Sequence, residues 1–150
     1  MIKPLSQRDP KWSLNKLGIS DLTVGRYGCT TTCISMLSEY FKCYQRPDQL
    51  ATKTLNYTKD GLILWKSIDN LAHMKFEKRL YGRNDAEIME SLKDPNKAVI
   101  FEVERRHWVT AIRKNRFSNS YKVIDPWFGD YCRVDGRYKG ITGSAHFITK

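Results

Sequence analysis

The hydrophobic pattern of this chain changes its period after residues 94–96, Asp-Pro-Asn, and this change limits the fold classes open to it. Before that point, apolar residues recur three and four positions apart, which is the spacing of a helix with one buried face. After it, short runs rich in β-branched and aromatic residues are separated by turn-forming residues, as is typical of strands. Helices that come first and strands that come second predict an α+β domain with an antiparallel sheet.

The same pattern predicts the individual elements. The predicted helices span residues 29–42, 47–55, 62–73 and 85–93. The predicted strands span residues 98–103, 107–112, 121–124 and 145–149. The first helix has the clearest apolar stripe, formed by Cys33, Ile34, Leu37, Tyr40 and Phe41. The Pro, Asp and Gly residues within 4–28 predict an irregular segment there.

Length and composition favour one globular domain that spans residues 1–150. With 41% hydrophobic and 28% charged residues, the chain is neither disordered nor collagen-like nor a coiled coil. No uncharged run approaches the roughly 18 residues of a transmembrane helix. The first residues lack the apolar segment of a secretory signal peptide, so we expect synthesis in the cytoplasm. We also expect a monomer.

The chain is basic, with 26 Lys and Arg against 16 Asp and Glu, which gives a net charge of +10. The excess is spread evenly, because residues 1–75 carry 11 basic and 6 acidic groups and residues 76–150 carry 15 and 10. A diffuse positive field attracts polyanions such as nucleic acid, anionic lipid or the anionic polymers of a bacterial wall. No nucleic-acid-binding motif is present, so we expect no specific nucleic-acid partner. Anionic wall polymers and simple solubility remain as explanations of the charge.

Four cysteines, at positions 29, 33, 43 and 132, are spaced unevenly and form no C-x-x-C motif. This spacing predicts neither a disulfide scaffold nor a metal site. Cys29 follows Gly28 at the start of the first predicted helix, where the helix dipole and free N–H groups favour a thiolate. Cys33 lies one turn later on the apolar stripe and is expected to be a buried thiol. The alternative for Cys29 is the same buried role.

His107 and Asp125 lie on two strands that we expect to form a hairpin. The predicted register places His107 opposite Asp125 and Ala111 opposite Tyr121, although a shift of two residues is compatible with the pattern. Directly opposed side chains lie on one face, with Cβ atoms about 4.5–5.5 Å apart. A carboxylate there would fix the orientation of the imidazole, as in a catalytic triad. A purely structural His–Asp contact is the alternative.

Other polar and aromatic residues have less specific signals. An oxyanion donor is often a side-chain amide, and Gln7, Gln45 and Gln49 are all candidates. Trp108 and Trp127 flank the proposed His–Asp pair, either to shield it or as ordinary core residues.

Four segments, taken together, resemble the papain-like cysteine peptidases of the bacteriocin-processing family, in its standalone branch. They are Ser6–Trp12, Val24–Cys29, His107–Val109 and Ile124–Gly129, and the resemblance covers roughly residues 4–130. It implies a papain-like fold, with a helical half that carries the nucleophile and a sheet half that carries the base. It also implies Cys29 as nucleophile, His107 as general base and acid, Asp125 as the residue that orients His107, and Gln7 as oxyanion donor.

We therefore expect a cysteine peptidase that hydrolyses amide bonds and needs neither metal nor organic cofactor. The best-known family members are fused to membrane transporters and cleave leader peptides after Gly-Gly, but this sequence has no P-loop and no membrane segment. One expected substrate is the peptide part of bacterial peptidoglycan, as for a phage-type endolysin that reaches the wall after release. The alternatives are a protein- or leader-processing peptidase, a transferase in which an amine replaces water, a non-catalytic binding module, and a polyanion-binding protein.

Overall fold

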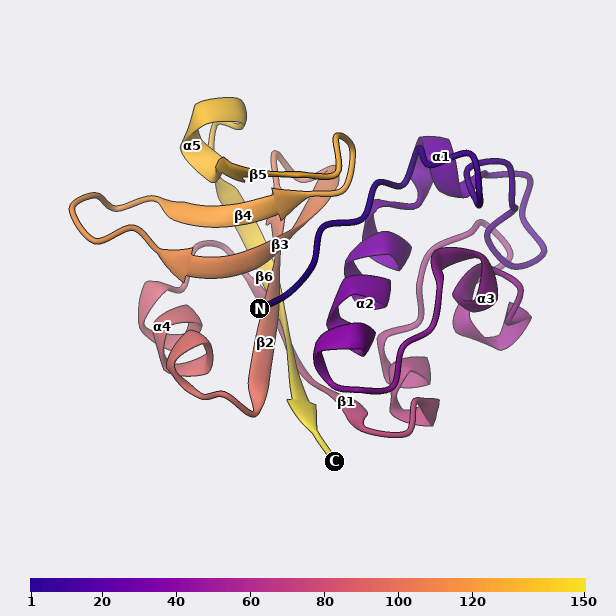
Figure 1. Ribbon diagram of the computed structural model, residues 1–150, viewed down its shortest axis with the longest axis horizontal. Helices are drawn as coiled ribbons and strands as arrows, with labels where there is room; N and C mark the ends of the chain where they lie inside the picture. Colours follow the sequence, from indigo (N-terminus) through magenta and orange to yellow (C-terminus); the bar gives the residue numbers. More distant parts are fainter.

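The computed structural model describes residues 1–150 and shows N-terminal helices followed by a six-stranded antiparallel sheet (Figure 1). The strands are β1 Met74–Tyr81, β2 Lys97–Val103, β3 His107–Lys114, β4 Tyr121–Asp125, β5 Asp130–Arg133 and β6 Ile141–Thr149. The helices are α1 Val24–Tyr27, α2 Cys29–Tyr40, α3 Pro47–Ala51, α4 Asp85–Lys93 and α5 Val134–Arg137, with 3₁₀ helices η1 Thr54–Asn56 and η2 Trp65–Asn70. The strand order is β1-β6-β2-β3-β4-β5, so the α+β prediction is confirmed.

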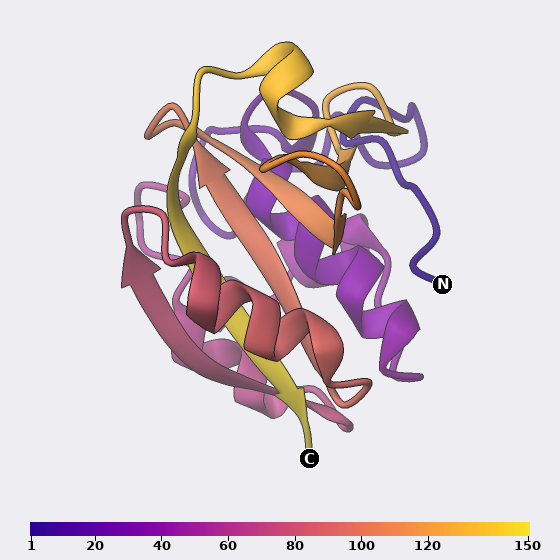
Figure 2. The same cartoon turned by 90° about the vertical axis from the view of Figure 1, so that its left-hand side faces the viewer.

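Helices α2 and α4 lie on opposite faces of the sheet (Figures 1 and 2). Helix α2 packs against a face that includes Ile100 of β2 and Phe147 of β6. Helix α4 inserts Ile88 against the other face, beside Phe101 and Val109. Because β2 is covered on both sides, its apolar residues are nearly continuous instead of alternating with polar ones.

Helix α2 forms where the apolar stripe predicts it. Cys33, Ile34 and Leu37 are completely buried, and Phe41 is almost so. Their spacing of three and four residues gives the helix one face for the sheet, whereas its first residue, Cys29, lies at the open end.

The second and third predicted helices are only partly correct. Helix α3 ends before Leu55, whose side chain is 83% exposed and therefore adds no buried surface that would extend the helix. Residues 62–73 contain the 3₁₀ helix η2 in place of an α-helix. Only Ile68 and Leu71 are buried there, whereas Leu64 is 43% exposed. Within η2 itself only Ile68 is buried, so the segment lacks the apolar stripe that would stabilise a longer α-helix.

Two strands were not predicted, because both lie at the edges of the sheet. The β1 strand carries charged side chains at Lys75, Glu77, Lys78 and Arg79, which hide the apolar alternation. Charged residues on an edge strand hinder pairing with other molecules. The β5 strand has only four residues and is too short for a periodic pattern.

The predicted register of the β3–β4 hairpin is wrong by two residues. Ala111 lies opposite Val123 and not opposite Tyr121, and the pairing shifts again at a bulge after Ala111. Side chains on a strand alternate between faces with a period of two, so a shift of two keeps His107 and Asp125 on the same face. The two residues are therefore diagonal neighbours, still within reach of each other's side chains.

Candidate active site

Cys29 is held at the first position of α2 by the tight junction between α1 and α2. Gly28 joins the two helices, and a Cβ atom there would come within 2.5 Å of the Val24 carbonyl oxygen. Only glycine therefore fits this junction without displacement of the backbone. The Gly28 carbonyl accepts hydrogen bonds from the backbone N–H and the hydroxyl of Thr32, which secures the first turn. Cys29 is thus presented at the end of a rigid helix.

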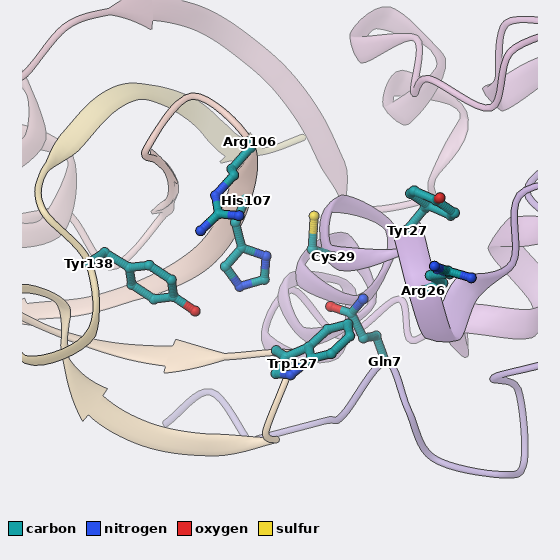
Figure 3. A pocket seen from close by; sticks show the side chains of 8 residues that line it. All are labelled: Gln7, Arg26, Tyr27, Cys29, Arg106, His107, Trp127 and Tyr138. Carbon is teal, nitrogen blue, oxygen red and sulfur yellow. The ribbon is translucent and has the colours of Figure 1, made fainter.

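His107 lies at the start of β3 and is oriented by Asp125 at the end of β4. The His107 Nε2 atom is 2.9 Å from Oδ1 of Asp125, so the predicted contact is confirmed despite the shifted register. With Nε2 occupied in this way, Nδ1 is directed toward Cys29 (Figure 3). The imidazole can exchange a proton with the thiol on one side while the carboxylate holds it on the other.

Asp125 is completely buried and accepts hydrogen bonds through both carboxylate oxygens. Oδ1 also accepts the backbone N–H of Trp127 at 3.0 Å. Oδ2 accepts the hydroxyl of Tyr138 at 2.5 Å and Nη1 of Arg137 at 3.3 Å. Tyr138 and Arg137 could not be selected from the sequence, because the short segment around α5 has no periodic pattern. Together these donors fix the carboxylate on which His107 depends.

These contacts favour an ion pair between Cys29 and His107. Burial alone would raise the pKa of Asp125, but hydrogen bonds from His107 and Tyr138 hold it below its usual value. Burial alone would lower the pKa of His107, but its hydrogen bonds with Asp125 and Cys29 raise it to about 9. Burial also opposes ionisation of Cys29, yet the hydrogen bond and positive charge of His107 lower its pKa. A thiolate beside an imidazolium is the form that these shifts favour.

The other three thiols lie in different surroundings. Burial raises the pKa of Cys33 well above its usual value and that of Cys132 to about 11. Cys43 packs beside the core just beyond the end of α2 and does not line the cavity that contains His107. All four cysteines are free, and Cys29 alone faces an imidazole across a pocket.

Gln7 enters the site from the N-terminal segment, whereas Gln45 and Gln49 lie elsewhere. Its backbone N–H donates to the Pro126 carbonyl at 2.8 Å, which ties this segment to the end of β4. Its side chain is 1% exposed, and Nε2 donates one hydrogen to the Gly25 carbonyl at 3.2 Å. Its Oε1 atom is buried without a hydrogen-bond partner and lies on the side of the amide toward His107, whereas Nε2 lies on the side toward Arg26 (Figure 3). Gln7 can therefore donate to a substrate oxygen only after rotation of its terminal amide. The first backbone N–H of a helix, here that of Cys29, is a donor that needs no such rotation.

Substitution of Gln7 by alanine is expected to lower kcat about 10²–10³-fold, the usual effect of removing one oxyanion donor. The rate at which iodoacetamide labels Cys29 should stay within about twofold of wild type, because Gln7 does not control ionisation of the thiol. Gln45→Ala is the matched control, since Gln45 bonds to Lys53 at the surface. Loss of Cys29 labelling in Gln7→Ala would show that Gln7 acts as a structural residue.

Eight residues line a cavity of about 420 Å³ around this group (Figure 3). They are Gln7, Arg26, Tyr27, Cys29, Arg106, His107, Trp127 and Tyr138. Trp127 forms part of the wall, and the Arg8 guanidinium lies 4.6 Å from its ring centroid and donates to its carbonyl. Trp108 instead packs on Trp65 in the core, with ring centroids 5.2 Å apart. Of the two tryptophans that flank the His–Asp pair, only Trp127 borders the cavity.

No protein-family model matches this chain, and no curated protein matches its sequence. None of its helices has both the length and the apolar surface needed to cross a lipid bilayer. The chemistry of the site is therefore argued from its own geometry.

Proposed function

We propose that this protein is a papain-like cysteine peptidase that hydrolyses amide bonds. The observation that carries the proposal is that Cys29 and His107 line one cavity while the buried Asp125 lies behind His107, with Asp125 Oδ1 2.9 Å from His107 Nε2. A nucleophile, a base within its reach and a third group that orients the base are the signature of covalent catalysis. The nucleophile at the start of a helix and the base on an antiparallel sheet agree with a papain-like arrangement.

In the proposed reaction, the Cys29 thiolate attacks the carbonyl carbon of the substrate amide. The oxygen becomes negative and is stabilised by the Gln7 side chain and the Cys29 backbone N–H. The C–N bond then breaks, the His107 imidazolium gives its proton to the leaving amine, and a thioester remains on Cys29. Neutral His107 removes a proton from water, which attacks the thioester. The acid product leaves and the thiolate–imidazolium pair is restored.

As substrate we propose the peptide part of bacterial peptidoglycan. The net charge of +10, spread over both halves of the chain, supports this choice because it would concentrate the protein on the anionic polymers of the wall. An amide-cleaving enzyme on the wall would release amino groups and no new reducing sugars. Cleavage of a Gly-Gly leader peptide without action on walls would instead support a processing peptidase.

The thiol–imidazole pair can be tested without any substrate. At pH 6, iodoacetamide is expected to alkylate Cys29 more than about tenfold faster than Cys33, Cys43 and Cys132, because reactivity follows the thiolate fraction. The difference in alkylation rate between Cys29 and the other three thiols should narrow above about pH 9, where His107 loses its proton and ordinary thiols ionise. Peptide mass spectrometry after brief labelling measures all four rates in one sample.

Two variants control this experiment. His107→Ala should reduce labelling of Cys29 at pH 6 to the rate of the other thiols, since the positive charge that lowers its pKa is gone. His73→Ala should leave it unchanged, because His73 lies away from the cavity. Equal labelling of all four cysteines in the wild-type protein would refute the proposed function.

A further inference from the structure

The walls of the active-site cavity are positively charged. Arg26 and Arg106 are among its eight lining residues, and none of the eight is an aspartate or a glutamate. In Figure 3 the two arginines lie on either side of the reactive pair, Arg106 beside His107 and Arg26 beyond Cys29. They come from different halves of the molecule, Arg26 from α1 and Arg106 from the turn between β2 and β3.

Neither arginine is held in a close ion pair by the protein itself. Arg26 contacts only the ring of Tyr27, with 5.9 Å between its guanidinium carbon and the ring centroid. Arg106 has one acidic neighbour, Glu104, at 3.9 Å, and its own side chain is 76% exposed. By contrast, Arg137 near the same site forms two hydrogen bonds of 2.7 Å with Asp130. Arg26 and Arg106 therefore keep their charge and their hydrogen-bond donors for a ligand.

These charges are also not needed to ionise the nucleophile. The groups that chiefly lower the pKa of Cys29 are His107, Trp108 and Thr30. Exposed guanidinium groups that border a reactive pocket without a structural partner are suited to bind carboxylates of a substrate.

The proposed reaction assigns each arginine to one side of the scissile bond. His107 must give its proton to the leaving amine, so the amine part of the substrate lies toward His107 and its chain neighbour Arg106. The acyl part stays on Cys29 and extends to the other side, where Arg26 and Tyr27 form the wall (Figure 3).

We propose that the substrate is an acidic peptide with a carboxylate on each side of the scissile amide, one bound by Arg106 and the other by Arg26. This inference rests on the proposed function, since it uses the direction of proton transfer at His107. It adds the charge of the substrate and two residues that determine specificity.

A pair of alkylating reagents tests the charge preference without a known substrate. Iodoacetate and iodoacetamide react alike with a thiolate but differ in charge, so the ratio of their rates at Cys29 reports the local field. Arg26→Gln and Arg106→Gln should each lower this ratio about three- to fivefold at low salt, as expected for loss of one exposed charge interaction. The rate with iodoacetamide should stay close to that of wild type. Arg116→Gln, on the β3–β4 loop away from the cavity, should leave the ratio unchanged.

Matched peptides then test the assignment of sides. Replacing Asp by Asn after the scissile bond should raise KM in the wild-type protein and have little effect in Arg106→Gln. Replacing Asp by Asn before the scissile bond should also raise KM in the wild-type protein, and it should have little effect on KM in Arg26→Gln. An Asp-to-Asn exchange that raises KM equally in the wild-type protein and in both arginine variants would overturn the assignment of sides.

The outcomes separate this inference from the proposed function. If Cys29 is labelled selectively but neither arginine variant changes the iodoacetate-to-iodoacetamide ratio, the acidic-substrate inference is wrong and the peptidase proposal stands. If Cys29 is no more reactive than Cys33, Cys43 and Cys132, the proposed function fails and this inference fails with it.

Discussion

Cys29→Ala protein is expected to leave suspensions of purified bacterial walls turbid under conditions in which wild-type protein clears them. Without the thiolate no thioester can form, and loss of the nucleophile of such a triad lowers turnover on the order of 10⁶-fold. The measurements are the decrease in turbidity, the amino groups released and the reducing sugars released. Wild-type protein should release amino groups only.

The stability of Cys29→Ala is the internal control. Removal of the Cys29 thiol from this partly buried position should leave the thermal unfolding midpoint unchanged or slightly higher, because sites built for reactivity are rarely optimal for stability. A variant with a much lower midpoint would mean that Cys29 is a packing residue. New reducing sugars from wild-type treatment would contradict an amide-cleaving activity.

Asp125→Ala is expected to have a double effect, on turnover and on stability. Loss of the carboxylate frees the His107 ring to rotate, and loss of the orienting group of a triad lowers kcat on the order of 10⁴-fold. It also leaves the half-buried Tyr138 hydroxyl and the Trp127 N–H without their acceptor. Removing one member of a buried charged network costs about 3 kcal/mol, so the midpoint of urea unfolding should fall clearly.

Asp125→Asn separates the two effects. Its amide oxygen still accepts the His107 N–H, so we expect partial activity and a smaller loss of stability than in Asp125→Ala. Without the negative charge, the pKa of His107 falls, and the pH above which Cys29 loses its labelling advantage should fall with it. If both variants match wild type in kcat and in this pH dependence, another residue orients His107.

The sequence was most informative where a local rule determines the outcome. The Gly28–Cys29 junction and the apolar stripe behind it place the thiol at the start of α2, because spacing defines the buried face of a helix. His107 and Asp125 were predicted to be in contact because side chains alternate along two paired strands. The contact is present although the predicted register is wrong by two residues, since such a shift keeps both side chains on one face. Gln7 could not be separated from Gln45 and Gln49 by local rules, and only the resemblance to a peptidase family selected it.

The remaining features depend on contacts between distant segments. The charged residues of β1 hide its strand pattern, and only its pairing with β6 shows that it belongs to the sheet. The 3₁₀ helix η2 has too few buried residues to define a hydrophobic period. Tyr138 reaches Asp125 from the single turn α5, at a point fixed only by how the chain returns from β5. Arg26 and Arg106 are ordinary basic residues in the sequence, and their position on opposite sides of one cavity appears only in three dimensions.

The position of β6 inside the sheet has a consequence for when the site can exist. This strand is the last in the chain, yet it lies between β1 and β2 and supplies Phe147 to the surface on which α2 rests. A chain in which residues 141–149 have not yet joined the sheet therefore has β1 without its strand partner, β2 paired on one side only, and incomplete support for α2. Pairings over such long separations form late, because closing a long loop costs entropy before the contacts form. The thiol on α2 is therefore held against a complete sheet, and aligned with His107, only after β6 has joined its two neighbours.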